Sequence, residues 1–295
     1  MNKAYWGSVR FFRHLYTAGF IVLLSLPVCA AFYFWQVGFA ATRDMNRIPT
    51  ESLARDSLEF MGRDVFSYQK KYPDMMVAPA GNRIVSANTV YLTFDDGPSP
   101  VTEKVLDVLK HYRIQGTFFV IGEHLDSPAA RETVRRILRE GHSLGIHSET
   151  HRYRKIYASV EAWLDDFAAV EKRLTDITGV RPTLFRFPGG SINVYNSAIY
   201  QELIAEMTRR GYVYFDWNVS AGDISNVPVR PETLFANVVS RTPVEKCAVV
   251  LMHDSAGKTG TLKALPKIIE HYRAKGLRFD RLQHDTWPVA FGYRN

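Results

Sequence analysis

Two adjacent carboxylates, Asp95 and Asp96, end an apolar stretch immediately before a Gly-Pro turn. Neighbouring carboxylates repel each other, so holding both ionised is costly unless a cation lies between them or one stays protonated. The pair therefore favours a metal site with a general base beside it. The alternative is an ordinary turn, because Asp, Gly and Pro are the usual turn formers.

A second group with ligand chemistry is the stretch H-S-E-T-H, in which His147 and His151 are four residues apart. On a helical turn this spacing points both imidazoles to one side, where they can bind one divalent ion. A solvated helix face is the alternative for such a pair. The H-E-x-x-H motif of zinc proteases fits poorly, since Ser148 stands where that motif has the Glu that acts as general base.

The two groups together supply three metal ligands of mixed nitrogen and oxygen type, namely Asp96, His147 and His151. Three protein ligands leave a position open for water, as catalytic zinc sites require. Asp95, next to the ligand Asp96, can then take a proton from that water. Zinc fits these donors, and cobalt, nickel or manganese can occupy the same set.

These residues carry a family resemblance. The run T-F-D-D-G-P from Thr93 to Pro98, followed by H-S-x-x-H, resembles the polysaccharide deacetylases with the NodB homology domain, also called carbohydrate esterase family 4. The resemblance covers about residues 88 to 285. It implies that Asp95 is the catalytic base and that Asp96 and the two histidines bind the metal.

Further stretches resemble the remaining family motifs. R-F-P-G, from Arg186 to Gly189, resembles the third motif, whose Arg orients the catalytic Asp and whose last residue offers a backbone N–H to the oxyanion. L-M-H, from Leu251 to His253, resembles the fifth motif. There the resemblance implies that the Leu lines the acetyl pocket and that the His is the general acid.

The fourth motif of the family corresponds to the stretch from Trp217 to Asp223. The resemblance implies that Asp223 orients the acid His253, and Trp217 is assigned to the substrate pocket. A Trp often follows that Asp in the family, whereas Ile224 stands here. Taken singly, each motif residue has an ordinary alternative role, such as a surface arginine, a core residue or a loop cap. Five motifs in order with compatible chemistry favour one shared site.

The elements that must position these residues follow from the hydrophobic pattern. Short β-branched or aromatic runs predict strands over 89–94, 117–121, 143–147, 183–186, 212–217 and 247–252, with a last one near 278. Helical patterns alternate with them over 102–112, 131–140, 159–178, 197–210, 231–240 and 262–275. This alternation predicts an α/β fold with a parallel sheet, whose continuously apolar strands are buried on both faces.

About seven such units predict a distorted (β/α) barrel, which is also the fold that the resemblance implies. Barrel enzymes place their chemistry at the carboxyl ends of the strands. Each motif named above follows a predicted strand, so all of them are expected on one rim of the barrel.

The N-terminal part of the chain predicts a membrane anchor. Residues 15–42 carry no charge and exceed the roughly 20 residues needed to cross a bilayer. Lys3, Arg10 and Arg13 precede this span, which favours a cytoplasmic N-terminus and a catalytic domain outside the cell membrane. A cleaved signal peptide is the alternative, with a small-residue site near Cys29, and it would give a secreted protein.

The predicted organisation is therefore a cytoplasmic N-terminus and anchor over 1–42, a stalk or linker over 43–87 and a deacetylase domain over 88–295. An amphipathic helix is favoured over 50–72. The net charge of +7 is spread through the chain, which argues against nucleic-acid binding, and no protein partner is predicted. Cys29 and Cys247 are not expected to form a disulfide.

The resemblance implies a metal-dependent hydrolase that removes acetyl groups from a glycan. N-acetylglucosamine residues of peptidoglycan, or of a chitin-like polymer, are the expected substrate in the cell wall. One alternative is an esterase acting on O-acetylated xylan or a similar polymer. The other is a glycan-binding protein without catalytic activity.

Overall fold

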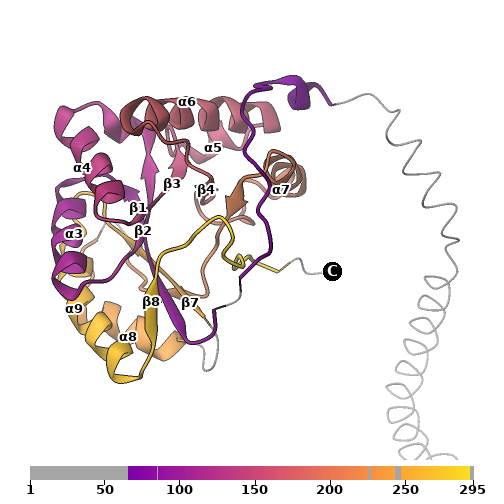
Figure 1. Cartoon of the computed structure of the whole chain (residues 1–295). Helices are drawn as coiled ribbons and strands as arrows, with labels where there is room; N and C mark the ends of the chain where they lie inside the picture. The colour runs from indigo at the N-terminus through magenta and orange to yellow at the C-terminus, as the bar shows by residue number, and fades with distance from the viewer. Residues whose placement is uncertain (1–65, 85, 225–226, 243–246, 293–295) are drawn as a thin grey trace, which may run out of the picture. The chain divides into compact units, whose positions relative to one another are not determined.

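Parallel strands form the centre of the structure. The computed structural model describes residues 66–84, 86–224, 227–242 and 247–292. In this part of the chain a sheet of eight strands runs in the order β5-β4-β3-β2-β1-β7-β6, with β8 also paired to β1 (Figure 1). The strands are β1 (Thr89–Gly97), β2 (Thr117–Ile121), β3 (Ser143–Ser148), β4 (Leu184–Phe185), β5 (Val213–Tyr214), β6 (Val219–Ser220), β7 (Ala248–His253) and β8 (Arg278–Asp280).

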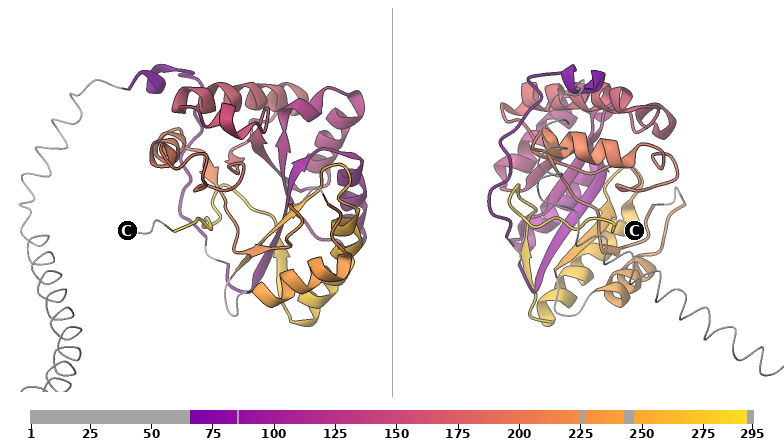
Figure 2. Two further views of the ribbon diagram at one scale, coloured as in Figure 1. Left: turned by 180° about the vertical axis from the view of Figure 1, so that it is seen from behind. Right: turned by 90° about the vertical axis from the view of Figure 1, so that its right-hand side faces the viewer.

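Helices connect the strands and cover one face of the sheet (Figures 1 and 2). They are α3 (Pro100–Tyr112), α4 (Pro128–Arg139), α5 (Tyr153–Ile156), α6 (Val160–Thr178), α7 (Tyr200–Arg209), α8 (Pro231–Arg241) and α9 (Thr259–Ala274), with 3-10 turns η1 (Ser67–Lys70) and η2 (Gly122–Leu125). Local sequence sets their ends. Ser99 caps α3 by accepting a hydrogen bond from the Val101 N–H, and α6 ends at Gly179 with φ at 73°.

Side chains of the central strands alternate between the two faces of the sheet, as strand geometry requires. In β1, Leu92 and Phe94 pack beneath the helices in the large core, whereas Tyr91 belongs to a smaller cluster on the opposite, inner face. In β7, Val250 lies in the large core and Val249 in the inner cluster. The same alternation directs Thr93 toward the inner face, above that cluster.

The two ends of the sheet do not meet in the part of the chain that the structure describes. Within the strand predicted over 212–217 only β5 forms, and β6 follows that range; the two short strands lie at opposite ends of the strand order. The chain between them crosses the gap, and its Asp216 N–H donates to the Val289 carbonyl at 2.8 Å. The fold is thus a parallel half-barrel, which fits the predicted distorted (β/α) barrel without full closure, and the segment after β8 lies across its open side.

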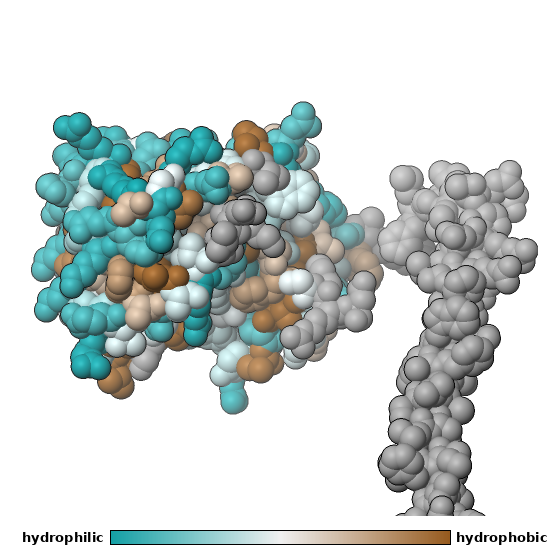
Figure 3. Space-filling model, turned by 90° about the horizontal axis from the view of Figure 1, so that it is seen from below, coloured by the Kyte–Doolittle hydropathy of each residue, from teal (hydrophilic) through white to brown (hydrophobic). Residues whose placement is uncertain are grey.

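The apolar span predicted over 15–42 lies outside the described residues. Most of the amphipathic helix predicted over 50–72 lies outside them as well. Among the described residues, no helix has the length and apolar character needed to span a bilayer. Cys247 is a free thiol. The surface seen in Figure 3 is mostly hydrophilic, with apolar residues in small separate patches.

Candidate active site

A bulge at the end of β1 brings both carboxylates to the same place. Adjacent strand residues normally face opposite sides of a sheet, but the register of β1 against β2 shifts between Asp95 and Gly97. Asp96 has φ at 71°, in the left-handed region. Its Oδ1 lies 3.4 Å from His147 Nε2 and 3.3 Å from His151 Nε2. The carboxylate of Asp96 therefore faces both imidazoles.

The two histidines converge through a turn and not through a helix, so the predicted helical turn is wrong. His147 belongs to β3, and the backbone then turns sharply, with φ at 134° for Ser148 and 53° for His151. Asp166, on α6, accepts hydrogen bonds from the next two backbone N–H groups, those of residues 149 and 150. These bonds hold the turn, and the two imidazole rings lie 5.1 Å apart.

The donors fit a divalent metal. His147 Nδ1 donates to the carbonyl of Arg186 at 2.9 Å, which leaves the Nε2 lone pair directed at Asp96. Burial lowers the pKa of His147 to about 3, so the ring is neutral, as a ligand must be. Asp96 Oδ1 is buried and has no hydrogen-bond partner in the described structure. One ligand atom each from Asp96, His147 and His151 lies within 4.8 Å of the others, so a single cation can satisfy all three.

Arg186 connects Asp95 to the rest of the inner face. Its guanidinium is fully buried and donates to Asp95 Oδ1 at 2.9 Å and to Thr93 Oγ1 at 2.7 Å. It also donates to the carbonyls of Phe215 and Asp216, at 2.8 and 3.1 Å. Removing one partner of such a buried ion pair typically costs about 3 to 5 kcal/mol of stability.

Asp95 is buried, and its environment raises the pKa of its carboxyl. Burial raises the pKa of its carboxyl against the opposing charges of Arg186 and His253, and the net direction is upward. A general base works best when its pKa approaches the working pH. Its second oxygen, Oδ2, lies 3.8 Å from His147 Nε2, beside the three metal donors.

His253 and Asp223 form a second buried pair on the other side of Asp95. His253 is the register neighbour of Asp95 across β1 and β7. Its Nδ1 lies 2.8 Å from Asp223 Oδ1, while Asp223 Oδ2 accepts from the His253 N–H at 2.8 Å and from Thr261 Oγ1 at 2.7 Å. Burial lowers the pKa of His253, but the hydrogen bond and charge of Asp223 outweigh it and raise the pKa above its ordinary value.

Of the other predicted site residues, Gly189 follows β4 on the same rim, whereas Trp217 precedes β6 and packs with Cys247 against the inner cluster. Gly189 is exposed in a turn with φ at 76° and, within the described residues, its N–H has no hydrogen-bond partner. Trp217 is half-buried, 5.8 Å from the Arg186 guanidinium and 4.9 Å from the ring of Phe291. Leu251 is buried in β7, two residues before His253. Ile224, where the family often has Trp, is 65% exposed.

Sequence reasoning missed three buried residues that support the site. Thr93 bonds Arg186, and the carboxylate of Asp216 accepts from the Ser191 and Phe291 N–H groups. Asp254 accepts from Thr102 Oγ1 at 2.6 Å, and burial raises its pKa to about 7. Thr93 is the first residue of the T-F-D-D-G-P motif, and Asp216 and Asp254 each stand next to a motif residue, so their positions in the sequence were the available signal.

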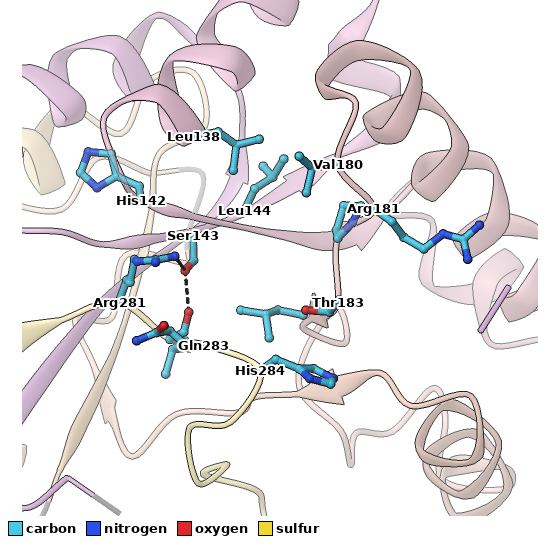
Figure 4. Close-up of a pocket in the computed structure, with 13 residues that line it drawn as sticks. Leu138, His142, Ser143, Leu144, Val180, Arg181, Thr183, Arg281, Gln283 and His284 are labelled. Carbon is cyan, nitrogen blue, oxygen red and sulfur yellow. Dashed lines mark hydrogen bonds between the residues drawn. The ribbon is translucent and has the colours of Figure 1, made fainter. Parts of the chain in front are cut away.

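A cavity of about 220 Å³ lies elsewhere, where the chain after β8 passes the amino ends of β3 and β4 (Figure 4). Its lining includes His142, Arg281 and several aliphatic side chains. Arg281 donates to Ser143 Oγ at 3.1 Å, and His142 Nδ1 accepts the Gly116 N–H at 3.0 Å. None of the predicted site residues lines this cavity, so the candidate chemistry belongs to the carboxyl ends of the strands.

The comparisons agree with this site. A family model described as polysaccharide deacetylase matches residues 82–208. The chain is 34% identical to YheN of Bacillus subtilis over 209 residues, covering 68% of this chain and 69% of YheN. It is 29% identical to a peptidoglycan-N-acetylglucosamine deacetylase of Bacillus cereus over 233 residues, or 78% of this chain and 82% of the relative.

A solved structure is similar to this chain over nearly the whole length of that structure. The catalytic domain of peptidoglycan N-acetylglucosamine deacetylase from Eubacterium rectale matches with a TM-score of 0.67 and 34% identity, covering 74% of this chain and 98% of that domain. The chain described here belongs to the polysaccharide deacetylase family, as its motifs predicted. It is therefore an enzyme of the hydrolase class that acts on acetylated glycans.

Proposed function

We propose that this chain hydrolyses the N-acetyl groups of N-acetylglucosamine residues in a cell-wall polymer of the peptidoglycan type. One observation carries the proposal, namely the convergence of three kinds of group at one rim. A base paired with an arginine, Asp95, lies beside the donors Asp96, His147 and His151, and an acid paired with a carboxylate, His253, flanks the base. The similarity to peptidoglycan-N-acetylglucosamine deacetylases supports this substrate.

Asp96, His147 and His151 are the residues that would hold a divalent ion, which we propose to be zinc. When bound, such an ion polarises the acetyl carbonyl and lowers the pKa of water. Asp95 takes the proton of the attacking water, while Arg186 keeps its carboxylate in place through the 2.9 Å bond. The raised pKa of Asp95 makes it a stronger base than an ordinary carboxylate, which favours this transfer.

His253 then donates its proton to the leaving nitrogen. An amine is a poor leaving group without protonation, and Asp223 favours the protonated form of His253 by raising its pKa. An alkoxide leaving from an O-acetyl ester needs less of this assistance, so the pair favours an amide substrate. The Gly189 N–H is assigned to the oxyanion, a type of donor that typically contributes about 3 kcal/mol. Leu251 and Trp217 are assigned to the acetyl and sugar pocket.

The proposal places the reaction outside the cell membrane. This location is inferred from the uncharged span over 15–42, which lies outside the described residues. Membrane fractionation of cells expressing the full chain tests it. Full-length chain in the membrane fraction supports an anchor. A shortened chain in the medium instead supports cleavage and secretion.

Acetate release is the direct test of the function. Purified full chain, loaded with zinc, is given N-acetylglucosamine oligomers, peptidoglycan and acetylated xylan, with and without chelator. We expect release from the N-acetylated glycans that stops when the metal is removed. Release from xylan alone contradicts the amide substrate, and release that survives complete metal removal contradicts the mechanism.

A further inference from the structure

Two large apolar side chains stand exposed on the loop that follows Gly189. Val194 is 84% exposed and Tyr195 is 48% exposed. Exposed apolar residues are common on protein surfaces, and a single one needs no explanation. This pair lies on a loop whose base is part of the candidate site, and the way the loop is held distinguishes it from an ordinary surface loop.

Buried polar groups fix the backbone of the loop. Asn196 is fully buried, accepts from the Asn193 N–H at 2.8 Å and donates to the Ser191 carbonyl at 3.0 Å. The Asn193 amide in turn donates to the carbonyls of Pro188 and Gly190, at 3.2 and 3.0 Å. A satisfied buried network of this kind rigidifies the backbone that it holds. The loop therefore presents its exposed side chains in a set position.

Tyr195 is linked to the catalytic groups through Tyr153. The two tyrosine rings lie 5.0 Å apart, and the Tyr153 ring meets the His151 ring edge-on at 5.2 Å. A Cβ on Gly189 would lie only 2.8 Å from Cε1 of Tyr153. A side chain at Gly189 would thus collide with this ring, and glycine leaves the space that Tyr153 occupies. The aromatic pair extends from the proposed metal donors and oxyanion donor outward to the loop.

We propose that the exposed ring of Tyr195, which packs against Tyr153 at an interplanar angle of 53°, forms a sugar platform, on which a hexopyranose ring of the glycan chain rests its apolar C–H face next to the residue that loses its acetyl group. This proposal rests on the proposed function and deepens it, because it makes an oligomer rather than a single sugar the preferred substrate. Tyrosine suits the task, since its ring offers apolar area and its hydroxyl a polar end.

The test compares Tyr195→Ala with Tyr195→Phe in the full, metal-loaded chain. Alanine removes the ring, and we expect kcat/KM for N-acetylglucosamine oligomers to fall about 2- to 10-fold through KM, the range that aromatic contacts typically contribute. A small acetyl ester without a sugar is expected to lose less, and phenylalanine is expected to restore most of the oligomer activity. An equal loss on both substrates overturns the platform.

Tyr112→Ala is the matched control. Tyr112 lies at the far end of α3 on the outer surface, where its hydroxyl donates to Glu270, so its loss is expected to leave the oligomer KM unchanged. Calorimetry of oligomer binding to the metal-free chain separates this proposal from the proposed function. Binding that weakens in Tyr195→Ala supports the platform even where no acetate is released. Oligomer binding that is absent in the wild type, or equal in the two chains, overturns it.

Discussion

Two buried histidines, His142 and His147, stand at opposite ends of β3 and invite comparison. Both are 3% exposed, and burial lowers the pKa of each, to about 4 for His142 and about 3 for His147. By burial and protonation alone they are equivalent. Only one of them lies among metal donors.

The difference lies in what each ring nitrogen bonds. His142 Nδ1 accepts the Gly116 N–H, so in the neutral ring the proton is on Nε2. His147 Nδ1 donates to the Arg186 carbonyl, so its Nε2 carries the free lone pair and faces Asp96. The comparison teaches that burial and neutrality do not by themselves mark a metal-binding histidine; His147 differs because the hydrogen bond of its Nδ1 leaves Nε2 facing other donors.

The largest effect on activity and metal binding is expected from substituting His147. His147→Gln removes the ligating nitrogen, so acetate release should fall to background. The affinity for the ion should fall by more than about 100-fold, because losing even a residue that only hydrogen-bonds a metal ligand costs up to about that much. Acetate assays and metal titration of the full chain measure both. Activity close to that of the wild type would remove His147 from the site.

Asp95→Asn tests the base while leaving the metal donors intact. Asparagine keeps an oxygen for Arg186 but cannot take a proton at neutral pH, so kcat should fall about 10²- to 10⁴-fold. Bound metal, measured by elemental analysis, should stay at the wild-type level. A variant that loses its metal together with its activity would instead make Asp95 a ligand.

The pH profile sharpens the account of the acid. Because Asp223 raises the pKa of His253, activity that needs protonated His253 persists above the ordinary histidine range and is lost as pH rises through that raised pKa. Asp223→Asn removes the charge, so the alkaline limb of kcat should begin at a lower pH in this variant than in the wild type. Initial rates measured across the pH range locate the limb in both chains. An unmoved limb would assign the alkaline group elsewhere.

The smallest effect is expected at the other end of β3. His142→Gln leaves the Gly116 N–H without its ring acceptor, which should lower the free energy of unfolding by about 1 to 3 kcal/mol. Denaturant unfolding measures this loss. Turnover per folded molecule and metal content should remain those of the wild type, and a loss of metal would end the distinction between the two histidines.

Much of the site was predictable because its residues follow strands with clear patterns. The apolar run before Asp95 and the run before His253 predicted β1 and β7, and parallel pairing then made these two residues neighbours. One ligand atom each from Asp96, His147 and His151 lies within 4.8 Å of the others, as the predicted donor set requires. Alternation of apolar runs was enough for these elements because it reflects burial on both faces of the sheet.

The parts that sequence missed depend on contacts between distant segments. The turn that carries His151 is held by Asp166 from α6, and helical spacing could not reveal it. Only β5 forms within the strand predicted over 212–217, because Asp216 bonds the segment after β8 instead of a neighbouring strand, and β6 then follows at the opposite end of the sheet. The residue types likewise do not predict the bulge that turns Asp96 toward the histidines. The one favourable feature is that Asp tolerates a positive φ.

Metal stoichiometry tests the central claim most directly. The full chain, stripped with chelator and titrated with cobalt as a spectroscopic stand-in for zinc, should bind one ion per chain with acetate release rising in parallel. That binding should be lost in His147→Gln and kept in His142→Gln. A chain that deacetylates glycan with no bound ion, or binds cobalt equally in both variants, would contradict a metal centre built from Asp96, His147 and His151.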